Sequence, residues 1–375
     1  MTLISAEKHL PYDRPKLSKK LDIKAAEMCL RPAEWYKEAG FDLMLGHKVN
    51  KVDVEHKCLT LDSGESVNYD KLVYCTGGAP RKLNIDGENL HGVYTLRTPE
   101  DANSINENVI EKNVVIVGGS FIGMEVAAAV VKSAKTVTVI DRNSVSFQTT
   151  LGDEVGKILQ DMHFSNGVGF EMNAEIDSLE GDEEGNVTGV KLKNGKQLLA
   201  DIVITGIGVV PSTQSFQHLP DFLNQRGLIP VDQYMKTKYP DICAAGDIVQ
   251  FPLATYDNEI VNIGHWGLAM YMGKIAALSS MGKSVPAHTV PFFWSVQFGK
   301  SVRFAGICNG CDRTLLQSDD TGFLLIYSKD GYVKGVCTLG RDPVAAHFRN
   351  IIVQGQKLKI EDAAETFNSV LGSKL

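Results

Sequence analysis

One stretch of the chain limits its fold more than any other: "NVVIVGGSFIGMEVAAAVVKSAKTVTVID", residues 113 to 141. An apolar run is followed by glycines, then by a segment of small apolar residues, and then by β-branched residues that end in an acid. This pattern predicts a buried parallel strand at 113–119, a helix at 124–134 and a second strand at 136–141. Such segments form a βαβ unit, so we expect an α/β fold built on parallel sheets.

Residues 113–132 are also apolar enough to suggest a membrane span. Glu125 and three glycines within this stretch argue against a span, because a spanning helix needs roughly 20 apolar residues without a charge near its middle. The first residues are too polar for a secretory signal. The net charge of -7 gives no electrostatic reason to expect binding to nucleic acid or to an anionic membrane.

The seven cysteines are scattered along the 375 residues. This distribution is unlike the dense, paired framework of a small secreted domain, and it favours reduced thiols in an intracellular compartment. We expect a cytoplasmic protein, with the mitochondrion as the alternative.

The glycine spacing after the first strand is typical of a nucleotide site. Gly118 and Gly123 fill the first and third places of the dinucleotide-binding fingerprint, and Ser120 stands at the second. The free amides at the start of the following helix attract an anion such as pyrophosphate. Asp141 ends the second strand, where a carboxylate accepts hydrogen bonds from the ribose 2′-hydroxyl. We therefore predict NADH binding, with NADPH as the alternative because Arg142 lies beside the acid, and an α/β crossover without a nucleotide as the structural alternative.

Three further apolar runs, at 70–78, 201–211 and 241–247, each end in glycines. Strand ends of this kind are where open parallel sheets place their ligands. Gly208, in the second run, is therefore a further candidate for NAD binding. Residues 184–200 alternate in polarity around an Asn-Gly pair, which predicts a hairpin.

Five motifs together resemble a known family: "LPYDRPKLSKK", "VIVGGSFIGMEV", "ICAAGDI", "GHWGLAMYMGKIAA" and "PFFWSVQFG". In their order they are similar to the FAD-dependent ferredoxin reductases of the pyridine nucleotide-disulphide oxidoreductase superfamily, and most similar to the apoptosis-inducing-factor 3-like branch. The resemblance implies two Rossmann-like nucleotide-binding domains and a small α+β C-terminal domain. We expect an FAD-binding domain at 1–112 and 236–285, an NAD(P)-binding domain at 113–235 and a C-terminal reductase domain at 286–375.

The resemblance also bears on the first residues. The segment "TLISAE" is similar to the second strand of the family's FAD unit. We therefore expect the first FAD glycine loop, and the Rieske-type domain of the closest branch, to be lacking from this sequence, so that the FAD domain is incomplete.

The resemblance assigns several side chains to FAD. Glu7 is matched to the acid on the adenosine ribose, and Asp247 to the acid on the ribityl chain. The other flavin-side residues that the resemblance implies are Arg14, Lys19, His265, Trp266 and Trp294. For Asp247 the alternative is a helix cap after a strand, and for the two tryptophans it is a place in the apolar core.

Two of the matched residues are candidates for chemistry. The resemblance places Lys19 beside the flavin ring and brings Glu125 close to it. A Lys-Glu pair there would hold charge in a partly desolvated site and help to orient the nicotinamide against the flavin. The alternatives are an exposed first-turn acid for Glu125 and a solvated charge for Lys19. Hydride transfer itself needs no acid or base from the protein, because the cofactors carry the chemistry.

The remaining cysteine and histidine patterns narrow the choice of electron acceptor. "CNGC" at 308–311 has redox spacing, but Asn-Gly between "VRFAGI" and "RTLLQ" predicts a hairpin turn. The FAD and NAD regions contain no cysteine pair, which favours a one-electron acceptor such as ferredoxin or a Rieske-type iron-sulfur protein over a disulfide. The histidines lack metal-ligand spacing, so we expect no metal site, and His163 is interpreted as a satisfied helix-end residue.

Two functions follow from these observations. The first is an NAD(P)H-dependent flavoprotein oxidoreductase that passes a hydride to FAD and electrons to an iron-sulfur partner. The second is a flavin-free NAD-binding module or fragment with a cell-death signalling role, in keeping with the branch that the chain resembles.

Overall fold

The computed structural model describes residues 1–372, which divide into two compact units. Unit 1 comprises residues 1–13, 25–79 and 210–291, and unit 2 comprises residues 14–24, 80–209 and those from 292 onward. The short segment 14–24 thus belongs to unit 2, although both of its sequence neighbours belong to unit 1. The three predicted domain boundaries stay a prediction.

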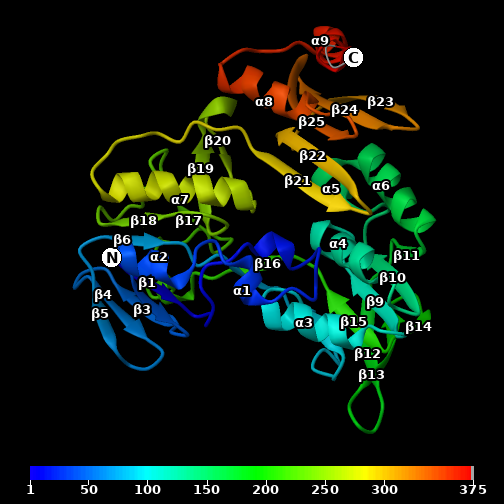
Figure 1. Ribbon diagram of the computed structural model, residues 1–375, viewed down its shortest axis with the longest axis horizontal. Helices are drawn as coiled ribbons and strands as arrows, with labels where there is room; N and C mark the ends of the chain where they lie inside the picture. The colour runs from blue at the N-terminus through cyan, green and yellow to red at the C-terminus, as the bar shows by residue number, and fades with distance from the viewer. Residues whose placement is uncertain (373–375) are drawn as a thin grey trace. The chain divides into compact units, whose positions relative to one another are not determined.

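The predicted βαβ unit is confirmed in unit 2 (Figure 1). It consists of β9 (Asn113–Val117), α4 (Phe121–Val130) and β10 (Thr136–Asp141), and the two strands pair in parallel. The side chains of Val114, Val115 and Ile116 are at most 1% exposed, because a parallel strand is covered on both faces. These strands belong to a five-stranded sheet of order β11-β10-β9-β15-β8. Its other strands are β8 (Val93–Thr95), β11 (Val168–Met172) and β15 (Ile202–Thr205).

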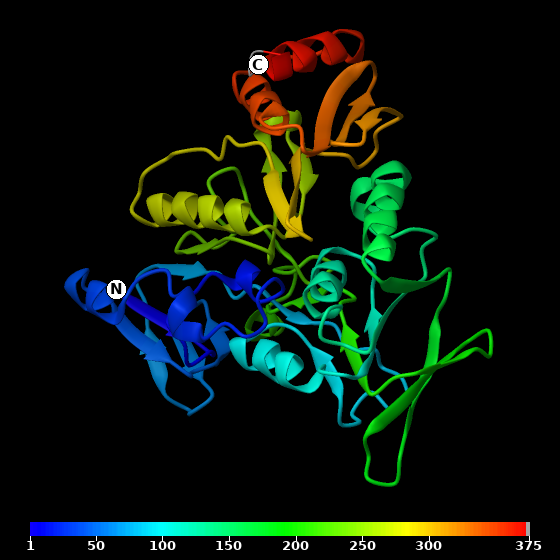
Figure 2. The same cartoon turned by 45° about the vertical axis from the view of Figure 1, so that its right-hand side comes forward.

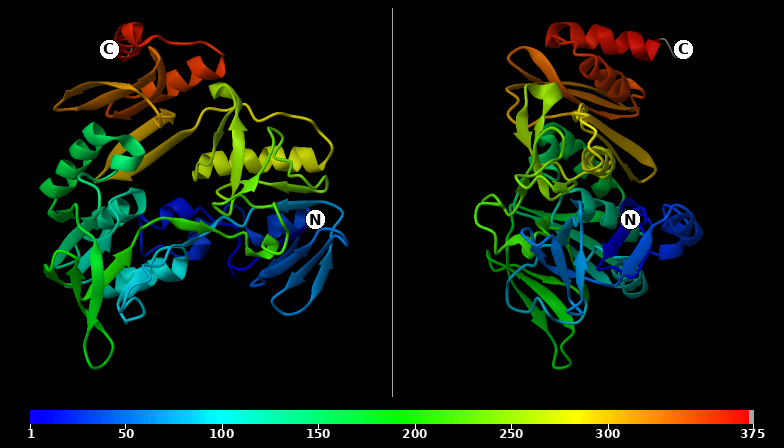
Figure 3. Two further views of the ribbon diagram at one scale, coloured as in Figure 1. Left: turned by 180° about the vertical axis from the view of Figure 1, so that it is seen from behind. Right: turned by 90° about the vertical axis from the view of Figure 1, so that its left-hand side faces the viewer.

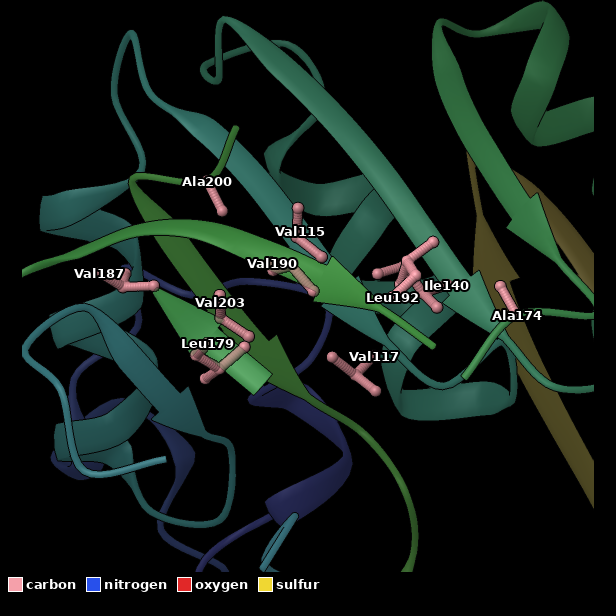
Figure 4. Close-up of a cluster of buried hydrophobic side chains, with 10 residues drawn as sticks. All are labelled: Val115, Val117, Ile140, Ala174, Leu179, Val187, Val190, Leu192, Ala200 and Val203. Atoms are coloured by element: carbon pink, nitrogen blue, oxygen red, sulfur yellow. The ribbon is translucent and has the colours of Figure 1, made fainter. Parts of the chain in front are cut away.

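Helices pack against one side of this sheet, and a small antiparallel sheet packs against the other. The helices are α3 (Pro99–Asn108), α4 and α6 (Asp153–Ser165), and the short α5 (Gln148–Leu151) packs on α6. The small sheet consists of β12 (Ile176–Gly181), β13 (Val187–Leu192) and β14 (Gln197–Leu199). Figure 4 shows the cluster between the two sheets, in which Val115 and Val203 lie near Leu179 and Val190. Each such buried side chain contributes about 1.5–3 kcal/mol. The predicted hairpin at 184–200 is confirmed by the antiparallel pairing of β13 and β14.

The C-terminal part of unit 2 is a five-stranded antiparallel sheet of order β21-β22-β25-β24-β23. Helices α8 (Val344–Val353) and α9 (Ile360–Gly372) lie beside it (Figure 2). The strands are β21 (Phe292–Gln297), β22 (Lys300–Gly306), β23 (Arg313–Asp319), β24 (Gly322–Lys329) and β25 (Tyr332–Leu339). Together with the parallel sheet, this arrangement confirms the predicted α/β class with a small α+β C-terminal part.

The hairpin that was predicted at "CNGC" is wrong. A tight turn is present, since Gly310 has a φ of 69° and the Cys311 N–H donates to the Cys308 carbonyl at 3.3 Å. However, β22 pairs with β21 and β25, and among residues 1–372 β23 pairs with β24 alone. Asn-Gly specifies a local reversal of the chain, whereas the partners of the flanking strands are set by the β24–β25 hairpin, which occupies the positions between them.

Unit 1 contains two pairs of parallel strands. β1 (Thr2–Ser5) pairs with β2 (Asp42–Leu45), and β6 (Leu72–Tyr74) pairs with β18 (Ile242–Ala244). The helix α7 (Trp266–Ser280) packs against β6 and β18 (Figure 3). The strands predicted within 70–78 and 241–247 are thereby confirmed, and their carboxyl ends lie at one edge because they run in the same direction.

The other elements of unit 1 are short. Two three-stranded sheets have the orders β3-β4-β5 and β17-β19-β20, and β7 pairs with β16. The strands are β3 (Val49–Asp53), β4 (Cys58–Leu61), β5 (Ser66–Asn68), β7 (Gly78–Pro80), β16 (Val209–Pro211), β17 (Ile229–Pro230), β19 (Val249–Leu253) and β20 (Glu259–Val261). The helices are α1 (Ala25–Met28) and α2 (Ala33–Glu38). Among residues 1–372, no helix combines the length and the apolar character that crossing a membrane would require.

We predict that the mutation Gly123→Ala destabilises unit 2. A Cβ at Gly123 would lie 1.9 Å from the Gly118 carbonyl oxygen, so α4 would have to move away from the glycine turn. Such overpacking costs about 1–3 kcal/mol or more. The matched control is Gly273→Ala in α7, where a Cβ would meet nothing within 4 Å. Removing that helical glycine should instead stabilise the chain by about 0.5–1 kcal/mol. Denaturant unfolding of both variants checks this, and equal stability of the two would contradict the close approach.

Candidate functional site

The start of α4 has the geometry of an anion site. Gly118 has a φ of 107°, and a Cβ there would lie 2.5 Å from the Gly206 carbonyl oxygen. The turn therefore requires glycine at this position. Ser120 is the N-cap residue of α4, and its side chain makes no capping hydrogen bond. The backbone amides of the first helical turn and the Ser120 hydroxyl can thus both donate to a bound phosphate.

Asp141 lies against the same turn. Its Oδ2 atom accepts a hydrogen bond from the Gly119 N–H at 2.6 Å, and its Oδ1 atom accepts one from the Asn143 N–H at 2.8 Å. These bonds fix the carboxylate at the carboxyl end of β10, beside the glycine turn. Gly208, at a φ of 95°, has nothing within 4 Å of an added Cβ, so the backbone there leaves room for a ligand.

The segment that carries Lys19 forms consecutive tight turns in unit 2. It begins with a 3-10 turn, η1 (Arg14–Lys16), and the Lys19 and Lys20 N–H groups both donate to the Lys16 carbonyl oxygen, at 3.1 and 3.0 Å. Leu17 is only 2% exposed and anchors the segment in the apolar interior. Arg14 Nη1 donates to the Arg97 carbonyl oxygen at 2.5 Å.

Glu125 projects from α4 into a buried cluster of donors. Lys19 Nζ lies 2.8 Å from Glu125 Oε2, and the Ser18 hydroxyl donates to the same oxygen. The Ser295 hydroxyl donates to Glu125 Oε1 at 2.6 Å. Glu125 is 6% exposed, so the alternative of an exposed first-turn acid is wrong. The alternative of a solvated charge for Lys19 is also wrong, because its charge is paired with a buried carboxylate.

The ammonium group of Lys19 keeps one donor for a ligand. Within residues 1–372 its nitrogen has two acceptors, the Pro15 carbonyl oxygen at 3.0 Å and Glu125 Oε2. An ammonium group has three N–H donors, and the Lys19 side chain is 28% exposed. The cluster therefore presents a fixed, charge-balanced donor at the surface of unit 2, which is the property required to orient a polar, planar ligand. The catalytic roles of Lys19 and Glu125 stay predictions.

In unit 1, Glu7 follows β1 and accepts a hydrogen bond from the Tyr12 hydroxyl at 2.6 Å. The Glu7 side chain is only partly buried, so it remains accessible at the carboxyl end of that strand. Its predicted role on the adenosine ribose stays a prediction.

Asp247 lies beside the start of α7, also in unit 1. A Cβ on Gly264 would lie 3.5 Å from Asp247 Cγ, and the Asn262 side chain donates to the Asp247 carbonyl oxygen at 2.9 Å. The helix-cap alternative for Asp247 is wrong, because strand β19 follows it. His265 is the N-cap residue of α7 and Trp266 its first residue, so the structure brings these three matched residues together.

Trp294 lies in unit 2 on strand β21. Its side chain is 55% exposed, so the alternative of a core aromatic is wrong for this residue. The preceding residue, Phe293, carries the core contact instead, with its ring 4.9 Å from that of Phe121 and 5.3 Å from that of Phe304. Trp266 is partly buried, which does not separate its two interpretations.

Sequence reasoning missed Ser18, Ser295 and Gln297. Gln297 Nε2 donates to the Ser295 hydroxyl oxygen at 3.1 Å, so it belongs to the same cluster. A strand alternates its side chains between two faces, and this places Ser295 and Gln297 on one face of β21 and Trp294 on the other. That alternation was the available signal, since two polar residues on the face opposite an exposed tryptophan must find partners inside.

The other groups singled out in the sequence are structural. Both ring nitrogens of His163 lie near backbone carbonyls, those of Leu159 at 2.8 Å and Met124 at 3.1 Å, and burial lowers the pKa of this histidine. All seven cysteines are free thiols, and burial raises the pKa of Cys311 to about 11, which opposes a redox role for "CNGC". Within the part of the chain that the structure describes, no three His, Cys, Asp or Glu side chains cluster as metal ligands.

Comparisons with known proteins match nearly the whole chain. The family model described as pyridine nucleotide-disulphide oxidoreductase matches residues 1–273, and the model described as reductase C-terminal matches residues 292–370. Apoptosis-inducing factor 3 from Homo sapiens is 37% identical over 361 residues, which are 96% of this chain and 60% of that protein. The chain therefore spans about three fifths of the length of this relative.

Solved structures share the fold. A ferredoxin reductase from Rhodopseudomonas palustris matches with a TM-score of 0.91 and 27% identity, over 97% of this chain and 90% of that one. The covalent complex of putidaredoxin reductase with putidaredoxin matches with a TM-score of 0.91 and 26% identity, over 96% and 88% of the two chains.

We predict that His265 makes unit 1 less stable in acid. Burial lowers the pKa of His265 to about 4, and its Nδ1 atom accepts the Leu268 N–H at the start of α7. Since the unfolded chain binds the proton near pH 6.5, the native state loses stability as the pH falls from about 6.5 towards 4. The loss should reach about 2 kcal/mol at pH 5, at 1.36 kcal/mol for each pH unit.

The matched variant is His265→Asn, which keeps a good N-cap acceptor and removes the titrating group. Denaturant unfolding at pH 7 and pH 5 should show a smaller loss in the variant than in the wild type. Equal losses would mean that His265 does not titrate in this range.

Proposed function

The chain belongs to the pyridine nucleotide-disulphide oxidoreductase family and carries its reductase C-terminal domain, and from this premise we propose that it is an NADH-dependent flavoprotein oxidoreductase. The proposed reaction is hydride transfer from NADH to FAD, followed by electron transfer to an iron-sulfur protein. The observation that carries the proposal is the buried Lys19–Glu125 pair on the helix that begins at the glycine turn.

When bound, NADH would supply the hydride and FAD would accept it, so the residues of the protein have to bind and orient the cofactors and exclude water. In unit 2 the residues proposed to bind NAD are Gly118, Ser120, Gly123, Asp141 and Gly208. They fit a dinucleotide for two reasons. The glycines leave no side chain where the backbone of the turn would come nearest to the nucleotide, and the first turn of α4 has free N–H donors. The Asp141 carboxylate favours the ribose diol of NADH over the 2′-phosphate of NADPH.

The proposed flavin-side residues also fit an aromatic, polar ligand. Lys19 has an N–H to donate, and Trp294 exposes an indole surface that a planar ring can cover. Arg14 is proposed on the same side in unit 2, with its guanidinium oriented by the Arg97 carbonyl. In unit 1 we propose Glu7, Asp247, His265 and Trp266. There the α7 N-terminus carries partial positive charge, which favours an electron-rich ring edge.

Lys19 and Glu125 are proposed to orient the reacting rings. Glu125 fixes the position of the ammonium group, and the free N–H of Lys19 holds the ligand in register for transfer. Neither residue needs to exchange a proton in this role.

For the electron acceptor we propose a ferredoxin or a Rieske-type iron-sulfur protein. The support comes from the relatives, which include a reductase solved in complex with putidaredoxin. The free thiols further support a reducing compartment, and we propose the cytoplasm, with the mitochondrion as the alternative.

We predict that the purified chain mixed with FAD shows a protein-bound flavin absorption band that NADH bleaches without oxygen. The Lys19→Met variant should bind FAD but bleach at least about tenfold more slowly, because loss of an orienting charged hydrogen bond costs about 1.5–3 kcal/mol. Gel filtration followed by visible spectroscopy and stopped-flow absorbance measures both effects. A colourless protein that still binds NADH would overturn the reductase and leave the flavin-free NAD-binding module.

We predict that Asp141→Asn weakens NADH binding about tenfold and changes NADPH binding less, because of the two nucleotides only NADH has a free ribose 2′-hydroxyl that can donate to the carboxylate. Asp161→Asn is the matched control, since this acid pairs with Lys157 on the surface of α6. Fluorescence titration with each nucleotide gives the four dissociation constants. An unchanged ratio between NADH and NADPH would exclude Asp141 as the selecting residue.

A further inference from the structure

We infer that Ser295, supported by Gln297, is a positioning residue for hydride transfer: it holds Glu125 so that Lys19 is presented to the reacting rings. This inference rests on the proposed function and deepens it. Neither residue was matched to a ligand, and both lie on β21, far along the chain from the glycine turn.

The two oxygens of Glu125 are held by donors from two separate parts of the chain. Oε2 accepts from Lys19 and Ser18, which belong to one turn of the chain. Oε1 accepts from Ser295, 170 residues further along the chain than Glu125. With donors on both oxygens the carboxylate plane is fixed, and the ammonium group of Lys19 is fixed with it. Without the Ser295 hydroxyl, only the donors on Oε2 would restrain the carboxylate.

The hydrogen bonds of this cluster have a defined direction. An ionised carboxylate only accepts, so the Ser295 hydroxyl must donate to Glu125. The Ser295 oxygen can then accept, which requires Gln297 to turn its Nε2 toward it, as observed at 3.1 Å. Ser295 and Gln297 are 1% and 2% exposed, so water does not compete for these bonds. The order Gln297 to Ser295 to Glu125 polarises each bond toward the negative charge.

The buried amide of Gln297 is only partly satisfied by hydrogen bonds. Its Oε1 atom is buried and has no hydrogen-bond partner among residues 1–372. An unsatisfied buried acceptor destabilises a fold, whereas an apolar side chain at this position would not. Among residues 1–372, the Gln297 amide donates a hydrogen bond to Ser295. β21 packs against α4, and this contact brings the pair to Glu125.

A matched control is available in the same sheet. Ser328 on β24 is fully buried, and its hydroxyl donates to the Arg313 backbone carbonyl at 3.1 Å. Replacing either serine by alanine removes one buried hydroxyl of the same kind. Of these two serines, Ser295 alone donates to a charged group of the proposed site.

The first experiment needs no cofactor. Unfolding by denaturant is measured for Ser295→Ala, Glu125→Gln and the double variant, and for the same cycle with Ser328→Ala. We expect non-additivity of at least about threefold in the unfolding equilibrium constant for the Ser295 cycle and additivity for the Ser328 cycle. Additive effects in both cycles would overturn the inference. Glu125→Gln is nearly isosteric and removes the buried carboxylate charge, while the Lys19 side chain is 28% exposed and water can solvate its ammonium group, which favours folding of every variant.

The second experiment measures anaerobic reduction of the FAD-loaded chain by NADH in a stopped-flow instrument. Ser295→Ala should lower the limiting rate constant about tenfold and change the NADH dissociation constant less than about twofold, as expected for lost orientation rather than lost binding. Ser295→Thr keeps the hydroxyl and should restore the rate to within about threefold. Ser328→Ala should leave the rate unchanged.

The outcomes separate the two claims. An unchanged rate in Ser295→Ala, failure of Ser295→Thr to restore a lost rate, or an equal loss in Ser328→Ala overturns the positioning role. A wild-type chain that NADH does not reduce overturns the proposed function and, with it, the role in hydride transfer. In that case the unfolding cycle still reports whether Ser295 holds Glu125.

Discussion

The buried carboxylate of Glu125 is the constraint on which the organisation of unit 2 depends. A charge that is 6% exposed is strongly unfavourable unless it is paired and hydrogen-bonded. Its donors come from residues 18, 19 and 295, at sequence separations of 107, 106 and 170. Residues 14–24 belong to unit 2, although the segments on either side of them belong to unit 1. Lys19 in this segment neutralises the carboxylate. Removing Lys19 would leave the charge unpaired, which costs about 3–5 kcal/mol in comparable cases.

The same helix connects this charge to the glycine turn. Gly123 lets α4 approach the Gly118 carbonyl, and Glu125 follows two residues later on that helix. A shift of α4 away from the turn would therefore move both the amides that face a phosphate and the carboxylate that holds Lys19. The proposed nucleotide site and the ammonium group thus depend on the same helix, so we expect a small steric change at Gly123 to affect both.

Local patterns predicted the elements that depend on local physics. The sequence predicted β9, α4 and β10 from the apolar run before Gly118, the small apolar residues after it and the acid at 141. Such elements can be predicted because the spacing of apolar residues shows within a few positions which side chains are buried. The turn at Cys308–Cys311 was also visible, but the pairing of its flanking strands was not, because that pairing depends on β24 and β25. The sequence likewise did not predict which of Phe293 and Trp294 faces the core, because the register of β21 decides this.

The pairing of Lys19 with Glu125 followed from a resemblance and not from spacing, and the geometry gives the physical reason for the residue types. The ammonium group divides its three donors among a backbone carbonyl, a buried carboxylate and the exposed side. The planar fork of arginine would favour a bidentate bond to Glu125 and place its remaining donors in the wrong directions. The hydroxyls of Ser18 and Ser295 donate the other hydrogen bonds that the Glu125 carboxylate accepts, and they add no charge. The cluster therefore stays neutral. Neutral hydroxyls have no motif of their own. Alternation along β21 marks Ser295 as facing inward, but the carboxylate that it contacts becomes visible only when the three chain segments are seen together.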